Sequence, residues 1–434
     1  MKAPSGADRP KIQAIRGVKD ILPGEVEAWQ LMERTARTLL ETFGYAEIKI
    51  PIFEFTELFA RSIGTATDIV EKEMYTFQDR DGKSVTLRPE GTASVIRAYI
   101  EHHLWTERPL TKLYYVGPMF RHERPQAGRF RQFYQIGAEI LGTANPLADA
   151  ELLTLLDRFF HALGVTPTTL LLNSLGCSLC RPAYRDALQR FLRDHAADLC
   201  EACRRRIDTN PLRVLDCKRE ECRTITQHAP VITGFLGPEC IEPFEEVTSS
   251  LDATGIRYRL EPRLVRGLDY YTKTAFEFTA EGLGAQNTIA AGGRYDGLVE
   301  ALGGPPTPGV GFAMGIERVV ALLKPGLTPP PAPDVFLAAL GKVVRPHMVR
   351  ILTDARDAGL RVETDYDQGG LKGQMRRADR VGARYVVILG EDELAKGAAV
   401  VRDMTTKSQT EVRLAELVSH LVTLIPPDSN RRSN

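Results

Sequence analysis

Residues 116–142, VGPMFRHERPQAGRFRQFYQIGAEILG, predict two strands joined by a short basic loop, and this hairpin decides the fold. The two-residue period of the second strand puts a polar set of side chains on one face: Arg131, Phe133, Gln135, Gly137 and Glu139. The opposite face is mostly apolar: Gln132, Tyr134, Ile136, Ala138 and Ile140. The apolar face can pack against helices, whereas the polar face is suited to hold a ligand. The alternative is an amphipathic hairpin whose polar face meets only solvent.

The first strand and the loop add charge to the polar face of this hairpin. In the first strand, Arg121 and Glu123 share one face, so both can join the floor formed by the second strand. The loop contributes the guanidinium groups of Arg124 and Arg129, and Gly128 permits a tight bend.

The composition is that of an ordinary globular protein. The chain has 434 residues, 43% of them hydrophobic and 26% charged, and its net charge is +0 at pH 7. This length predicts about two to four domains. Because the net charge is zero, contacts with nucleic acid must come from local basic patches. The sequence contains neither a run of about 20 apolar residues nor a secretory signal, so we expect no membrane association and a cytoplasmic location.

Residues 86–92, TLRPEGT, form a second candidate binding element and lead into a helix predicted at 93–103. Glu90 and Thr92, on either side of Gly91, could grip an ammonium group. Capping of the helix by Thr92 explains the same pattern equally well. Further upstream, residues 45–50 predict a strand after a helix at 25–43, a combination common at dimer interfaces.

All seven cysteines lie between residues 177 and 240, and cytoplasmic conditions disfavour disulfides between them. Cys177 and Cys180 are followed after nineteen residues by Cys200 and Cys203, a spacing typical of a four-thiolate zinc site. Cys217 and Cys222 are near enough in sequence to be alternative ligands. The competing interpretation is a set of reduced, partly buried thiols without metal.

Polar residues return in two further stretches, 264–278 and 288–297. Arg266, Tyr270 and Tyr271 lie within six residues of one another, which is unusual for a core, because buried tyrosine hydroxyls need partners. An imidazole or amine ligand could supply those partners. Residues 308–323 run from a glycine-rich strand into a helix, and Arg318 near its start is well placed to meet a phosphate.

The proline-rich residues 324–333, KPGLTPPPAP, mark a domain boundary. Beyond it, strands at 335–340, 361–366 and 385–389 alternate with helices at 346–358 and 371–382, which predicts a βαβαβ unit with a parallel sheet. A basic stripe follows the second helix and its end, and a plain solvated face is the simpler explanation for it. Its members are Lys372, Arg376, Arg380 and Arg384.

Four motifs together resemble the class II aminoacyl-tRNA synthetases, and among them the histidyl-tRNA synthetase family. The general class II marks are FRHE at 120–123 and GIER at 315–318. The stretches LVRGLDYYTKTAFEF at 264–278 and AAGGRYDGL at 290–298 are similar to the histidine-specific family. The resemblance extends from Ile15 to about Leu424, and the cysteine-rich segment departs from many family members, so zinc is not implied by it.

The resemblance implies an α+β fold: a class II synthetase catalytic domain with an antiparallel sheet flanked by helices, and a C-terminal α/β anticodon-binding domain. The expected division is a disordered N-terminus at 1–14, the catalytic domain at 15–323 with an insertion region at about 176–261, the linker at 324–333, the anticodon-binding domain at 334–425 and a disordered tail at 426–434. A homodimer is also implied, with residues 45–54 at its interface.

The implied reaction activates L-histidine with ATP to histidyl-adenylate and pyrophosphate, and then transfers histidine to the 3′-terminal adenosine of its tRNA, with Mg²⁺ accompanying ATP. The implied catalytic residues are Arg266, Arg121 and Arg318. ATP binding is implied for Arg121, Glu123, Phe133 and Arg318. Histidine binding is implied for Glu90, Gly91, Thr92, Arg121, Gln135, Glu139, Arg266, Tyr270, Tyr271 and Tyr295. Contact with the tRNA acceptor end is implied for Arg124, Gln126 and Arg129.

The main rival is a synthetase-like regulatory subunit of histidine biosynthesis, which keeps the fold without the activity. Such proteins lose motif residues and usually the C-terminal domain. Here both arginines of the general motifs and the complete α/β segment after the linker are present, which favours the enzyme.

Overall fold

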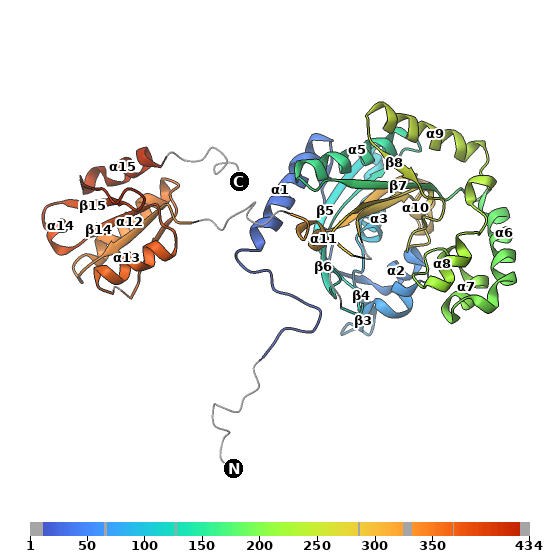
Figure 1. The fold of residues 1–434 in the computed structure, drawn as a ribbon, viewed down its shortest axis with the longest axis horizontal. Helices are drawn as coiled ribbons and strands as arrows, with labels where there is room; N and C mark the ends of the chain where they lie inside the picture. Colours follow the sequence, from blue (N-terminus) through green and yellow to red (C-terminus); the bar gives the residue numbers. More distant parts are fainter. Residues whose placement is uncertain are drawn as a thin grey trace, which may run out of the picture. The chain divides into compact units, whose positions relative to one another are not determined.

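The computed structural model describes residues 12–64, 67–125, 128–284, 287–323, 332–367 and 369–425, and the chain divides into two compact units, 1–328 and 329–434 (Figure 1). The predicted disordered segments lie outside the described residues at 1–11 and 426–434, as does most of the predicted linker, 324–331. Each unit is described by itself below.

An eight-stranded sheet forms the centre of the N-terminal unit. In spatial order its strands are β1 (Ala46–Glu47), β5 (Thr111–Phe120), β6 (Gln132–Leu141), β11 (Gly309–Gly315), β10 (Thr288–Arg294), β9 (Thr272–Ala280), β7 (Thr168–Ser174) and β8 (Tyr258–Leu260). The neighbouring pairs from β5 to β7 are antiparallel, as predicted, whereas β1–β5 and β7–β8 at the two edges are parallel. The sheet is therefore mixed.

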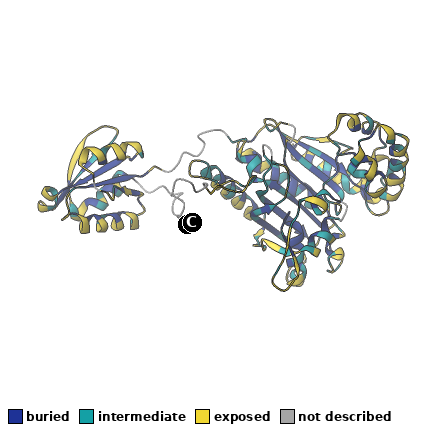
Figure 2. Cartoon of the chain, turned by 90° about the horizontal axis from the view of Figure 1, so that it is seen from below, coloured by how far each residue is buried: buried dark blue, intermediate teal, exposed yellow. Residues whose placement is uncertain are grey.

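One face of this sheet is covered by helices. They are α1 (Val26–Thr42), α5 (Leu147–Ala162), α9 (Pro238–Ala253) and α11 (Ile316–Val320). The main hydrophobic core lies between these helices and the sheet, and the strands are the most deeply buried part of the unit (Figure 2). Tyr134, Ile136, Ala138 and Ile140 of β6 point into this core, which confirms the predicted division of its two faces.

The first strand of the predicted hairpin ends earlier than expected. β5 ends at Phe120, so Arg121 and Glu123 follow the strand and do not lie in it. The Arg121 N–H still donates to the Arg131 carbonyl at 2.9 Å, but the His122 N–H donates to Glu73, which turns the chain out of the ladder. The strand predicted at residues 45–50 is similarly reduced to the two residues of β1.

Smaller elements flank the sheet. A three-stranded sheet consists of β2 (Phe53–Phe55), β4 (Ser84–Leu87) and β3 (Tyr75–Gln78). The helices near it are α2 (Thr56–Ile63), the π-helix η1 (Ile69–Glu73), α3 (Thr92–Glu101), α4 (Leu104–Glu107) and α10 (Leu298–Ala301). The segment between β7 and β8 is helical and contains α6 (Arg181–Asp194), η2 (Ala196–Asp198), α7 (Glu201–Thr209), η3 (Pro211–Val214), α8 (Glu220–Thr226), η4 (Ile232–Phe235) and α9.

The C-terminal unit confirms the predicted βαβαβ unit. Strands β12 (Val335–Ala339), β13 (Val362–Thr364) and β14 (Tyr385–Leu389) are parallel, and α12 (Arg345–Asp357) and α13 (Leu371–Arg380) connect them. Two antiparallel strands and two helices, which the sequence did not predict, complete the unit: α14 (Glu391–Ala395), β15 (Ala398–Asp403), β16 (Gln409–Arg413) and, after η5 (Leu414–Glu416), α15 (Leu417–Leu424). The sheet lies between α12 and α15 on one face and α13 on the other (Figure 1).

Candidate active site

A cavity of about 790 Å³ opens on the face of the large sheet opposite its helical cover. Strands β6, β9, β10 and β11 form its floor, and segments 128–130, 215–218 and 261–271 form its walls. Its volume is within the range of small-molecule sites. The polar face of β6 is therefore not a solvated surface, because Phe133 and Gln135 line this cavity.

One end of the cavity is lined by three arginines, Arg121, Arg129 and Arg318. Arg121 donates from Nε to the Pro89 carbonyl at 2.8 Å, and its guanidinium lies 5.3 Å from the centre of the Phe133 ring. Arg318 donates to the carbonyl of Thr288 at 2.8 Å and to that of Gly128 at 3.3 Å.

Burial, together with the positive charges of Arg129 and Arg121, lowers the pKa of Arg318. The three guanidinium groups repel one another, so a polyanion such as a triphosphate would bind favourably between them.

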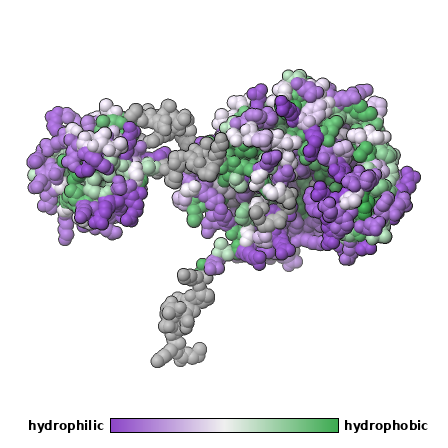
Figure 3. All heavy atoms as spheres, in the orientation of Figure 1, coloured by the Kyte–Doolittle hydropathy of each residue, from purple (hydrophilic) through white to green (hydrophobic). Residues whose placement is uncertain are grey.

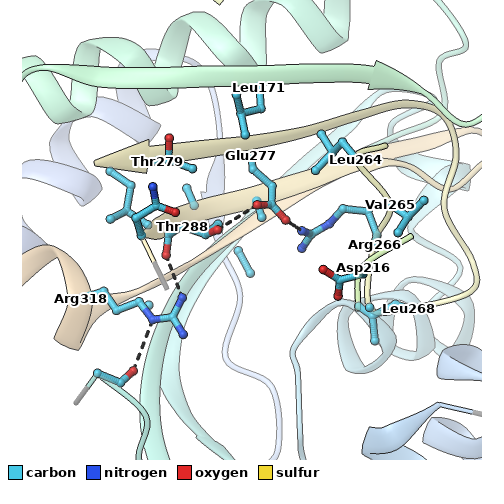
Figure 4. Close-up of a pocket in the computed structure, with 18 of the residues that line it drawn as sticks. Leu171, Asp216, Leu264, Val265, Arg266, Leu268, Glu277, Thr279, Thr288 and Arg318 are labelled. Atoms are coloured by element: carbon cyan, nitrogen blue, oxygen red, sulfur yellow. Dashed lines mark hydrogen bonds and ion pairs between the residues drawn. The ribbon is translucent and has the colours of Figure 1, made fainter. Parts of the chain in front are cut away.

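Arg266 lies farther along the cavity and forms an ion pair with Glu277 of β9 (Figure 4). The other Glu277 oxygen accepts a hydrogen bond from the Thr288 hydroxyl at 2.8 Å, so the carboxylate is fixed from two sides. Although burial disfavours the charge of Arg266, the Glu277 carboxylate raises its pKa. The guanidinium lies 5.7 Å from the centre of the Tyr271 ring. Arg266 is therefore a charged, oriented donor.

Glu90 occupies the N-terminus of α3. Its two oxygens accept the N–H groups of Thr92 at 2.6 Å and Ala93 at 2.9 Å. Glu90 and not Thr92 therefore caps the helix, and the Thr92 hydroxyl is directed instead to Glu139 at 2.7 Å. Burial raises the pKa of Glu90, and the two backbone hydrogen bonds partly offset this effect.

Glu139 and Tyr295 lie beneath the cavity and do not line it. Both side chains are fully buried, and the Tyr295 hydroxyl donates to one Glu139 oxygen while Thr92 donates to the other. Burial raises the pKa of Glu139 to about 8, so this carboxyl is protonated near neutral pH and then donates its proton in one of these two hydrogen bonds. Through Thr92, the pair is connected to the residues that line the cavity.

Several buried polar atoms have no hydrogen-bond partner among the described residues. Those around this cavity include Gln135 Oε1, the hydroxyls of Tyr115 and Tyr270, and Nε of Arg266, and others lie elsewhere in the chain. Buried polar atoms are normally paired, so a group of unpaired atoms in and beneath one cavity indicates a polar ligand. The Tyr115 ring lies against Gly91 and Gly137, where a Cβ atom would approach it to 2.3 Å. Glycine at these two positions makes room for that ring.

Of the three predicted tRNA-contacting residues, the structure describes Arg124 and Arg129. Arg124 is exposed, and Gln126 lies outside the described residues. Arg129 lines the cavity and forms an ion pair with Glu123 at 3.0 Å.

The prediction of a single site formed by Cys177, Cys180, Cys200 and Cys203 is wrong. Cys177 and Cys180 cluster with Glu239 and Cys240, whereas Cys200 and Cys203 cluster with Cys217 and Cys222. Cys180 immediately precedes α6, a helix of 14 residues, and Cys200 follows its far end. A helix of that length extends about 21 Å, which separates the two pairs.

Sequence reasoning assigned no role to Glu277, Thr288 or Tyr115. Glu277 had a detectable signal, because it is the only carboxylate of the strand at 272–280 and lies between Phe276 and Phe278. Tyr115 had none, since its position against two glycines depends on the pairing of β5 with β6.

Comparison with known proteins shows the family of the chain that forms this cavity. A family model described as histidyl-tRNA synthetase matches residues 17–319, and a model described as anticodon binding domain matches residues 334–424. The chain belongs to the histidyl-tRNA synthetase family.

Individual relatives agree with this assignment. A histidine–tRNA ligase of Geobacter sulfurreducens is 54% identical over 403 residues, which are 93% of this chain and 97% of the relative. The crystal structure of the apo histidyl-tRNA synthetase of S. aureus has a TM-score of 0.80 at 38% identity and covers 95% of this chain and 100% of its own.

A structure described as an ATP phosphoribosyltransferase regulatory subunit/histidyl-tRNA synthetase from Bacillus halodurans has a TM-score of 0.66 at 19% identity. It covers 88% of this chain and 99% of its own. At that identity the likeness shows the fold alone.

The activity of the family is therefore that of this chain. It activates histidine with ATP to histidyl-adenylate and pyrophosphate and transfers histidine to the 3′-terminal adenosine of its tRNA. Its substrates are histidine, ATP and the histidine tRNA, and the family description of the C-terminal unit connects that unit to the tRNA. No helix in the described ranges has the length and apolar character needed to span a membrane.

Proposed function

We propose that the three arginines and Phe133 form the ATP half of the cavity. Arg121 and Arg318 clamp the phosphates, because planar guanidinium groups suit bidentate contacts with phosphate oxygens. Phe133 stacks on adenine, and Glu123 reads its exocyclic amine. In support, Arg121 and Arg318 are held by backbone carbonyls at the same end of the cavity. Arg129, which lies beside Glu123, joins this half.

Arg266 is the residue that the proposed mechanism needs most. When the histidine carboxylate attacks the α-phosphate, negative charge accumulates there, and a pre-oriented guanidinium stabilises it. The ion pair with Glu277 orients Arg266 and ensures that the group is charged. The reaction requires no covalent nucleophile on the protein, because positioning and electrostatics accelerate it.

The remaining part of the cavity receives histidine. Glu90, Thr92 and Gln135 hold the ammonium group beside Gly91, and Arg121 and Arg266 lie near the carboxylate that reacts. Tyr270 and Tyr271 surround the imidazole. Glu139 and Tyr295 act from beneath, since Glu139 fixes the Thr92 hydroxyl and Tyr295 fixes Glu139. The unpaired oxygen atoms of Gln135 and Tyr270 support a polar ligand in this half.

The proposal includes two metals and the contacts with tRNA. Mg²⁺ accompanies ATP, and the phosphates supply oxygen ligands of the kind that it prefers. The free thiols of the insertion region, at about 176–261, offer ligands for structural Zn²⁺. Arg124, whose side chain is exposed, contacts the acceptor end of the tRNA.

The proposed organisation assigns residues 15–323 to catalysis and 334–425 to the anticodon. The proposed assembly is a homodimer with residues 45–54 at its interface, and the proposed location is the cytoplasm, where charged tRNA is used. Exposed apolar side chains on β2 support this interface.

The test of this mechanism is the substitution Arg266→Ala. We expect the rate of histidyl-adenylate formation in a single turnover to fall on the order of 10²-fold or more, as for other lost donors to a developing charge. Histidine binding, measured by calorimetry, should change much less. Arg257→Ala, an exposed arginine of the same unit, is the matched control and should leave both quantities unchanged. Adenylate synthesis near the wild-type rate in Arg266→Ala would show that the assignment is wrong.

A further inference from the structure

The seven cysteines of this chain are all free thiols, and all seven take part in two compact clusters. We name Cys200, Cys203, Cys217 and Cys222 the outer cluster, and Cys177, Cys180, Glu239 and Cys240 the inner cluster. In each cluster one ligand atom from every residue lies within 4.8 Å of the others. Segments distant in sequence are brought together in both clusters, so the grouping is not a consequence of local spacing.

The separations between the sulfur atoms match those of a tetrahedral metal site. With Zn–S bonds of about 2.3 Å, tetrahedral geometry places the sulfurs about 3.8 Å apart. In the inner cluster, Cys180 Sγ is 3.7 Å from both Cys177 Sγ and Cys240 Sγ. In the outer cluster, Cys200 Sγ and Cys217 Sγ are 4.0 Å apart. Both clusters therefore have space for one ion at their centre.

The fourth ligand of the inner cluster is a carboxylate. Glu239 Oε1 lies 3.3 Å from Cys180 Sγ and 3.6 Å from Cys177 Sγ. Cys180 and Cys177 precede α6, whereas Glu239 and Cys240 are in the first turn of α9. Zinc accepts carboxylate oxygen as well as thiolate, so three cysteines and one glutamate complete a tetrahedral set.

Backbone N–H groups support the sulfurs in both clusters. The Gly237 N–H donates to Cys180 Sγ at 3.2 Å, and the Cys200 N–H donates to Cys222 Sγ at 3.3 Å. Such outer hydrogen bonds orient metal ligands and stabilise the thiolate form. They are expected around a metal and are not needed for packing thiols.

The same geometry argues against other uses of these cysteines. A disulfide requires an S–S distance of about 2.05 Å, far below the separations in either cluster. Seven cysteines also cannot pair completely. A multi-iron cluster would hold its cysteine sulfurs farther apart than 4.8 Å, because several metal atoms must lie between them. A single tetrahedral ion remains.

We propose that this chain binds two Zn²⁺ ions, one held by the four thiolates of the outer cluster and one by the three thiolates and the Glu239 carboxylate of the inner cluster. This specifies the structural zinc of the proposed function, and metal content tests it independently of the enzymatic activity.

The outer ion stabilises a wall of the active-site cavity. Cys217 lies between Asp216 and Lys218, and all three residues line the cavity. On the same segment, Arg213 donates to the carbonyl of Arg266 at 3.3 Å. Fixing Cys217 to the start of α7 and to α8 therefore fixes the segment that contacts the Arg266 backbone.

The inner ion joins the two ends of the helical insertion near the histidine half of the cavity. Arg181, the residue after Cys180, donates to the carbonyls of Leu175 and Tyr271. The Lys273 N–H donates to the Gly176 carbonyl at 2.9 Å. A metal at this position holds α6 and α9 together, where the insertion meets the start of β9.

The experiment is metal analysis of the full-length protein, purified under reducing conditions from cells supplied with zinc. We expect two zinc ions per chain, and seven free thiols after denaturation with a chelator. Cys217→Ser and Cys177→Ser, which replace a partly exposed ligand of the outer and inner cluster respectively, should each retain one zinc ion. Each variant is the control for the other.

Every other outcome overturns part or all of the proposal. If the wild-type chain binds only one ion, the serine variants show which cluster holds it. A variant that keeps the ion shows that its own cluster does not bind zinc. No zinc, iron in its place, or five or fewer titratable thiols would overturn both sites.

A second pair of variants tests the unusual carboxylate ligand without removing a thiol. Glu239→Gln should accelerate zinc loss to a chelator at least about tenfold, the lower limit of what losing even an outer-shell partner costs. Glu242→Gln, an exposed glutamate of the same helix, should lose zinc at the wild-type rate. Equal rates for both variants would exclude Glu239 as a ligand.

Discussion

At the scale of single residues, the site depends on how charged groups are compensated. Arg266 is compensated by Glu277, whereas Glu139 has only neutral hydroxyl donors, those of Thr92 and Tyr295. A fully buried carboxyl without a cation is most stable in its protonated form. Glu139 is therefore neutral in the folded protein at a pH where an exposed glutamate is charged.

This difference predicts how the stability of the protein changes with pH. Burial raises the pKa of Glu139 from 4.5 to about 8, so between these values the folded state holds a proton that the unfolded state has lost. The contribution of Glu139 to the free energy of unfolding should therefore fall as pH rises through this window, at most by about 1.4 kcal/mol per pH unit.

Glu139→Gln, which is neutral at every pH, isolates that contribution. The free energy of unfolding of the wild type, measured by urea denaturation and expressed relative to Glu139→Gln, should decrease from pH 5 to pH 8. Other titrating groups cancel in the difference between the two proteins. A difference independent of pH would show that Glu139 is charged in the folded state.

At the scale of elements, α13 shows how one helix can be anchored and still expose a charged face. The buried side chain of Gln374 accepts the Ala339 N–H at 3.1 Å and donates to the Ala339 carbonyl at 2.8 Å, which fixes the helix to β12. Lys372, Arg376 and Arg380 on the same helix are exposed, and the surface of this unit over α13 is hydrophilic (Figure 3). Among the described residues, none of these three forms an ion pair within 4.0 Å.

We expect this stripe to contact tRNA. Replacing Lys372, Arg376 and Arg380 with Ala should raise KM for tRNA and leave histidine-dependent ATP–pyrophosphate exchange unchanged. Each lost phosphate contact should reduce the slope of log affinity against log salt by about 0.7 to 0.9.

The matched control replaces Lys342, Arg345 and Arg350, exposed basic residues of the same unit, with Ala. This control should keep both KM and the salt slope. Unchanged aminoacylation kinetics in the α13 variant at moderate salt would show that the stripe is a solvated face that does not contact tRNA.

At the scale of the whole molecule, the three-stranded sheet has an apolar face that the described residues leave exposed. Phe53, Phe55 and Phe77 are 58%, 56% and 48% exposed. Phe55 and Phe77 both pair with Val85 of β4, so their side chains share one face of the sheet. Adjacent exposed phenylalanines are typical of a protein interface, and residue 53 belongs to the segment proposed for the dimer, 45–54.

We therefore expect the wild type to have twice the chain mass of 48.2 kDa in solution, measured by light scattering after size exclusion. The double substitution Phe53→Glu and Phe55→Glu should shift the mass to that of one chain, because burying carboxylates at an interface is costly. Val349→Glu, at a residue 58% exposed on α12, should stay dimeric. A double variant that keeps the wild-type mass would exclude this face as the interface.

Much of the architecture could be predicted because it depends on local patterns. The alternation along β6 predicts which face meets the helices, and the βαβαβ segment follows from periods of two and 3.6 residues. The positions at which strands begin and end were less predictable from the sequence. β1 has only two residues, and Arg121 and Glu123 lie beyond β5, since hydrogen bonds to distant segments decide where a ladder ends.

By itself the sequence determined the family, the two units and the residue types of the site, because these depend on long motifs and on periodicity. Only the tertiary structure decided how those residues combine. It divided the cysteines between two clusters, paired Arg129 with Glu123 and paired Arg266 with Glu277. The physical reason is the same in each case: the contacts are made by side chains brought together by packing, and sequence spacing does not encode the direction in which the intervening chain runs.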